Sequence, residues 1–122
     1  MKYVLMYVSR PDLDAGADPE DTQALYKRVY EWFGEHEGVM ADSGAELLGP
    51  ETATSVTHGD GGPVVVDGPF NEAKEIIGGF SVIEVADMDA AIAVSRTWPL
   101  LDLPGGSVEI RPMVEDYSHM EQ

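Results

Sequence analysis

Alternating hydrophobic positions mark a strand at the start of the chain. Both of its faces are apolar: one carries Tyr3, Leu5 and Tyr7, and the other carries Val4, Met6 and Val8. An apolar pattern on both faces is typical of a strand that is covered from two sides. We therefore expect two covering layers around the sheet to which residues 2 to 8 belong.

A helix with one apolar stripe is predicted next. Residues 10 to 17 form a loop rich in Pro, Gly and Asp, after which Asp18 can cap a helix and Pro19 suits its first position. Large side chains then recur at steps of three and four residues, with three further aromatic residues widening the stripe: Leu25, Val29, Trp32 and His36, then Tyr26, Tyr30 and Phe33. Gly38 offers a left-handed C-terminal cap, so we expect the helix to end there.

The middle of the chain predicts short strands and a hairpin. Residues 45 to 48 suit a short strand, and residues 53 to 58 and 64 to 67 flank a glycine-rich turn as hairpin strands do. A longer strand is expected over residues 76 to 85, and a last one over residues 107 to 111.

A second helix lies between these last two strands. Asp87 can cap it, Ala91, Val94 and Trp98 share one side of it, and Pro99 is expected to stop it. Pro112 follows the last strand and fits the edge or the end of a sheet.

The order strand, helix, strand, hairpin, strand, helix, strand predicts an α+β fold: one domain over residues 1 to 122, a ferredoxin-like split βαβ pair with an inserted hairpin. Two helices can cover only one face of such a sheet. The other face, with alternate residues of the first strand and with Phe80 and Val82, needs a partner, and a second copy of the chain would serve. The pattern therefore predicts a homodimer.

Charge and composition exclude several classes of function. The 122 residues hold 23 acidic and 7 basic side chains, a formal charge of -16, which repels nucleic acid and anionic membranes. Adaptation to high salt would give the same bias.

The chain has no cysteine, which excludes thiolate chemistry and cysteine-based metal sites and favours a cytoplasmic compartment. The first apolar run is too short to span a membrane, and the glycine-rich segments do not match a phosphate loop, so we expect no membrane contact and no cofactor.

The turn from Asp67 to Glu75 is the most informative stretch for function. An Asp in a turn usually accepts a hydrogen bond from the amide two residues on, but here that residue is Pro69, which has no N-H. The Asp67 carboxylate could instead accept from Phe70, from Lys74 or from a ligand. Both a structural and a functional role stay open.

Other side chains carry weaker signals, each with a structural alternative. His36 could act as a general base, or simply end the helix. Arg111 could bind an anionic ligand, or pair with a neighbouring carboxylate. Trp32 and the other aromatic residues could line a ligand pocket, or fill the core. His58 with Asp60 would make half a metal site at a hairpin tip, so we expect no metal.

These residues also carry a resemblance. The stretch Asp67-Gly68-Pro69-Phe70 with Glu72, Lys74-Glu75 and Gly78-Gly79-Phe80, and the late stretch 107 to 112, resemble the YCII-related family in its DGPF branch. The resemblance covers nearly the whole chain and implies a ferredoxin-like dimeric α/β barrel. It also implies association with extracytoplasmic-function sigma factors, by genomic neighbourhood.

The chain departs from its better-characterised relatives in their catalytic pair. Those relatives, which include a dehydrochlorinase, are thought to use a His near the start of the first helix and an Asp just before the Pro that ends the second. Here Asp21-Thr22-Gln23 and Thr97-Trp98 stand at these places, so that lyase chemistry does not carry over.

Two hypotheses follow. The first is a homodimer that binds a small aromatic or anionic molecule in a pocket between helices and sheet near Asp67, as an enzyme or as a binding protein. Its candidate catalytic residues are Asp67, Lys74 and His36, and its candidate binding residues are Arg111, Phe70 and Trp32. The second is a non-catalytic signalling protein that engages a sigma factor.

Overall fold

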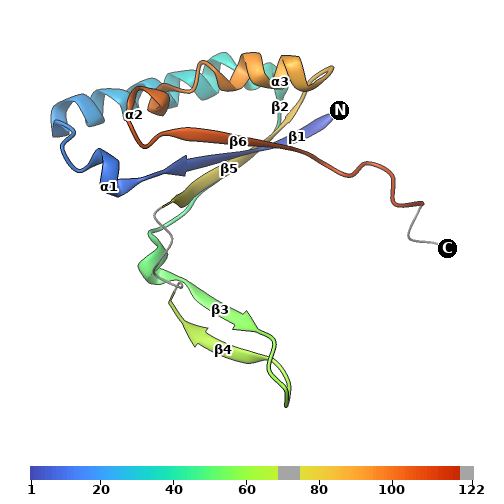
Figure 1. The fold of residues 1–122 in the computed structure, drawn as a ribbon. Helices are drawn as coiled ribbons and strands as arrows, with labels where there is room; N and C mark the ends of the chain where they lie inside the picture. The colour runs from blue at the N-terminus through green and yellow to red at the C-terminus, as the bar shows by residue number, and fades with distance from the viewer. Residues whose placement is uncertain (69–74, 119–122) are drawn as a thin grey trace.

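Four antiparallel strands form the central sheet (Figure 1). They are β1 (Lys2–Ser9), β2 (Met40–Glu46), β5 (Ile76–Glu84) and β6 (Ser107–Pro112), in the order β2-β5-β1-β6. The computed structural model describes residues 1–68 and 75–118. Each helical crossover joins two parallel strands that are separated by a strand of the other crossover, so two split βαβ units interleave. The α+β class predicted from the sequence is confirmed.

Two helices cover one face of this sheet (Figure 1): α2 (Pro19–Glu35) and α3 (Met88–Ser95). Both begin as the sequence predicts. The Asp18 carboxylate accepts a hydrogen bond from the backbone N-H of Glu20 at 2.8 Å, and that of Asp87 accepts from Ala90 at 2.9 Å.

A buried aromatic cluster joins the helices to the sheet. Tyr7 stacks on Trp98 with ring centroids 4.0 Å apart, and Trp32 meets both of these rings edge to face. Tyr3, Leu5 and Ile83 complete the sheet side of this core. The face of β1 that carries Tyr3, Leu5 and Tyr7 is therefore buried within a single copy of the chain.

Several predicted details are wrong. The first helix ends at Glu35, and a 3-10 turn (η1, Glu37–Val39) follows, so Gly38 is not a left-handed cap. Tyr26 and Tyr30 are exposed, because the helix layer has a sheet on one side only. The second helix ends at Ser95, and Pro99 instead begins another 3-10 turn (η3, Pro99–Asp102).

Two segments contain more regular structure than predicted. The expected loop after β1 holds a four-residue helix, α1 (Pro11–Asp14), and the Asp14 carboxylate accepts a hydrogen bond from the Gly105 N-H at 2.7 Å. Strand β2 begins at Met40, five residues before the predicted strand over 45 to 48. An irregular register against β5 obscures its alternation in the sequence.

The predicted hairpin is present and lies outside the main sheet. After a 3-10 turn (η2, Pro50–Thr52), β3 (Thr54–Thr57) pairs with β4 (Val64–Asp67) as a separate two-stranded sheet. Figure 1 shows the hairpin leading away from the four-stranded sheet, on the side opposite the helices. We call residues 47–68 the arm.

Candidate functional site

Asp67, the first candidate, lies at the base of the arm. It is exposed, is the last residue of β4 and pairs in register with Thr54. The next residue closes the hairpin base, because the Gly68 N-H donates to the Ala53 carbonyl at 2.7 Å. Phe70 and Lys74, the other candidates of this turn, lie outside the described residues.

Trp32 and His36 lie together in the helix layer. The Trp32 side chain is 3 % exposed, and its Nε1 donates to the Thr97 hydroxyl at 2.8 Å. His36 is half-buried at the end of α2, with Nδ1 2.9 Å from the Trp32 carbonyl oxygen and its ring 4.6 Å from the indole. Trp32 therefore joins α2 to the segment that follows α3, whereas His36 packs against the end of its own helix.

Arg111 lies on the face of the sheet opposite α2 and α3. It pairs in register with Val4, and its guanidinium lies 3.6 Å from the Glu109 carboxylate with both side chains largely exposed. His36 lies just before β2, and the arm with Asp67 begins just after β2. The two ends of this strand are about 20 Å apart. The described candidates, Asp67, His36, Trp32 and Arg111, are therefore not brought together within one copy.

The open face of the sheet is apolar along its centre. Val4, Met6 and Val8 of β1 are half-buried, and Ile77 and Phe80 of β5 are exposed by 50 % and 37 %. The space between helices and sheet, where the sequence placed a pocket, is instead filled by the aromatic core. Contiguous exposed apolar surface is a general feature of protein and ligand contact sites, so this face is the candidate site.

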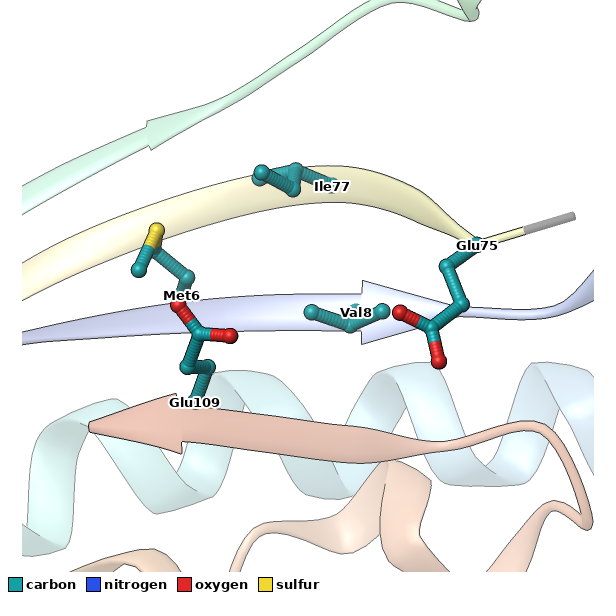
Figure 2. A pocket seen from close by; sticks show the side chains of 5 residues that line it. All are labelled: Met6, Val8, Glu75, Ile77 and Glu109. Atoms are coloured by element: carbon teal, nitrogen blue, oxygen red, sulfur yellow. The ribbon is translucent and has the colours of Figure 1, made fainter. Parts of the chain in front are cut away.

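A cavity of about 250 Å³ lies on this open face (Figure 2). Met6, Val8 and Ile77 form its apolar floor, and Glu75 and Glu109 stand on either side of it. Figure 2 shows the two carboxylates, one from the residue before β5 and one from β6, both reaching over β1. Glu75 is also the last residue of the turn that the sequence singled out.

The charges around the cavity are mainly negative. Two arginines lie near its carboxylates. The Arg111 guanidinium is 3.6 Å from Glu109, and at Arg10 the hydrogen bond with Asp12 raises the pKa of the guanidinium, with the charge of Glu75 contributing in the same direction. Because Arg10 binds Asp12 at 2.7 Å, its charge is largely matched. The lining therefore suits a ligand with an apolar body and hydrogen-bond donors or a positive charge, and it disfavours an anion.

Metal and membrane sites find no support in the described ranges, 1–68 and 75–118. No group of three His, Asp or Glu side chains there could hold a metal ion, and His58 and Asp60 lie 3.9 Å apart at an exposed hairpin tip. No helix in these ranges is long and apolar enough to cross a bilayer.

Comparison with known proteins identifies the family. The model of the YCII-related domain matches residues 1–115, and the chain therefore belongs to the YCII-related family. A similar protein is the uncharacterized protein R00369 of Rhizobium meliloti (strain 1021), which is 36 % identical over 69 residues. The match covers 57 % of this chain and 56 % of that protein, so the chain spans just over half the length of this curated relative.

The cavity residues Glu75 and Glu109 were not predicted as site residues. Most charged residues of this chain are acidic, and scattered acidic residues are expected to lie on the solvent-exposed surface. The signal that could have found them is the second apolar face of β1. Met6 and Val8 lie on that face, and Glu109 pairs in register with Met6.

Proposed function

We propose that this protein is a homodimer that binds a small molecule with an apolar, aromatic body on the open face of its sheet. The observation that carries the proposal is the cavity over Met6, Val8 and Ile77, which lies on apolar surface that the single chain leaves uncovered. A second copy on this face would exclude water from the cavity and bury the exposed apolar side chains of both copies.

The lining defines the ligand class further than the sequence did. Small-molecule sites are mostly apolar, with a few polar groups that fix the ligand's orientation. Here those polar groups are the carboxylates of Glu75 and Glu109. We therefore propose an aromatic ligand that carries hydroxyl or amine donors, in place of an anionic one.

The same geometry permits proton-transfer chemistry. A carboxylate next to a bound donor can accept its proton as a general base. In this proposal Glu75 and Glu109 are the acid-base candidates. Asp67, Phe70 and Lys74 stay candidates because they belong to the turn that ends at Glu75, whereas Trp32 and His36 serve the helix layer. Arg111 lies beside Glu109 on the same face and is proposed to orient it.

A binding experiment with a neutral aromatic probe tests the proposal. We expect 1-N-phenylnaphthylamine to gain fluorescence with the wild type, and Ile77→Asp, which puts a charge on the cavity floor, to weaken its binding at least about tenfold. Light scattering after size exclusion should show a wild-type dimer and a weakened Ile77→Asp dimer.

The control is Tyr26→Asp, which adds the same charge at a similar exposure on the helix layer, 53 % against 50 % for Ile77. It should leave both probe binding and dimerisation unchanged. A wild type that is monomeric and does not bind the probe would overturn the proposal, as would equal effects of the two variants.

The charge of -16 favours a second candidate function, a signalling partner of a basic protein such as an extracytoplasmic-function sigma factor. This function needs no ligand cavity. It predicts that the purified protein captures a sigma factor encoded beside its gene, with capture lost at high salt. No such neighbouring gene, or no capture at low salt, would eliminate it.

A further inference from the structure

The arm exposes several large apolar side chains. Val56 of β3 and Val65 of β4 are direct partners in register, and each is 67 % exposed. Leu48, between β2 and the arm's strands, is 82 % exposed. An isolated two-stranded hairpin is at best marginally stable in water, so such an arm is expected to pack against something.

The direction of the arm indicates where that support lies. The arm leaves the end of β2 and extends on the side of the sheet opposite the helices, which is the side of the open face (Figure 1). A second sheet stacked on the open face would lie about 10 Å below the first, and the arm would run alongside it. In a twofold dimer each copy would receive the other's arm.

The charges of the arm and of the open face do not by themselves select the occupant. The arm carries Glu51, Asp60 and Asp67 and no Lys or Arg. Of the chain's seven basic residues, Lys2 and Arg111 lie on the open face, where alternation along β1 and β6 directs them. Each of them has an acidic neighbour there, since Lys2 pairs in register with Glu84 and Arg111 lies 3.6 Å from Glu109, so the inference rests on the exposed apolar side chains and on the direction of the arm.

We propose that the arm clasps the second copy of the chain, with Val56 and Val65 packed against the partner. This inference rests on the homodimer of the proposed function, but it concerns a separate surface, since no arm residue lines the cavity. The hairpin is then an element of assembly that acquires its apolar cover only in the dimer.

Photocrosslinking tests the contact without assuming which partner residues receive it. A benzophenone amino acid placed at position 65 should yield covalent dimers on irradiation, and mixed ¹⁴N and ¹⁵N protein should show by mass spectrometry that the crosslinks join two copies. The control places the same group at position 30, where Tyr30 is 85 % exposed on the helix layer and where no dimer crosslink is expected.

A paired substitution tests the energetic role of the arm. Val56→Thr with Val65→Thr keeps the β-branched shape that suits strands but removes apolar surface, so we expect the dimer dissociation constant to rise about tenfold. The dissociation constant should not change in Tyr30→Ser. Circular dichroism of the variant should retain the helical signal of the wild type, because Val56 and Val65 lie outside the core that holds the helices.

The outcomes separate the two proposals. The arm proposal is refuted if the wild type is a dimer but position 65 gives no more crosslinks than position 30. It is also refuted if the double variant leaves the dissociation constant unchanged. Neither result contradicts the homodimer of the proposed function. A wild type that stays monomeric overturns both. Crosslinks confined to one copy would show that the arm folds back on its own chain and would also refute the clasp.

Discussion

At the scale of single residues, a buried hydroxyl chain ties the sheet together. The Tyr7 hydroxyl donates to the Ser81 Oγ at 2.8 Å, and the Ser81 hydroxyl donates to the Ser43 carbonyl at 2.8 Å. We expect Tyr7→Phe to lower the free energy of unfolding by about 1 kcal/mol, since one buried hydrogen bond is lost while the ring stays. Urea unfolding measures this, and Tyr30→Phe on the exposed surface should change stability by less than about 0.5 kcal/mol.

The same tyrosine gives a pH dependence. Burial raises the pKa of Tyr7 to about 12 from its usual 10, although the hydrogen bond with Ser81 opposes the shift. The unfolded chain then loses this proton near pH 10 while the folded chain keeps it, so folding is disfavoured as the pH rises. The advantage of the wild type over Tyr7→Phe should be complete below pH 10 and shrink between pH 10 and 12. A difference that is constant across this range would contradict the assignment.

At the scale of elements, the helix caps make a separate prediction. Asp87 caps α3, a helix of only eight residues, through its bond with the Ala90 N-H. Asp87→Ala should cost about 1 kcal/mol of folding free energy. Asp87→Asn keeps a capping oxygen and should retain most of that stability, as measured by thermal unfolding. If Asn and Ala destabilise equally, the charge and not the hydrogen bond is the source of the effect.

The elements also show what a sequence can predict. Asp18 and Asp87 act through their nearest neighbours along the chain, so both helix starts were predictable. Gly38 does not cap α2, because the helix is followed at once by the 3-10 turn η1, which leads into β2. Tyr26 and Tyr30 belong to the wide apolar stripe of α2 but are exposed. The sequence alone does not show which side of such a stripe contacts the sheet.

The candidate site was less predictable than the fold. Glu75 and Glu109 are more than thirty positions apart and meet only because β5 and β6 both flank β1. The turn that ends at Glu75 and the position of Arg111 were recognisable in the sequence, whereas the predicted pocket lay between the helices and the sheet. The aromatic residues that suggested that pocket are the core that fills it.

At the scale of the whole molecule, charge opposes compactness. A net charge of -16 on 122 residues produces a net repulsion in the folded chain, and the salt bridges Arg10–Asp12 and Arg28–Asp102 contribute little because they are accessible to solvent. Added salt shortens the range of this repulsion. We therefore expect the melting temperature to rise by about 3 to 6 °C between 20 mM and 500 mM NaCl at fixed protein concentration. Differential scanning fluorimetry measures the shift, and glucose of equal osmolality should produce a smaller one. A melting temperature that falls with salt would show that attractive ion pairs outweigh the net repulsion.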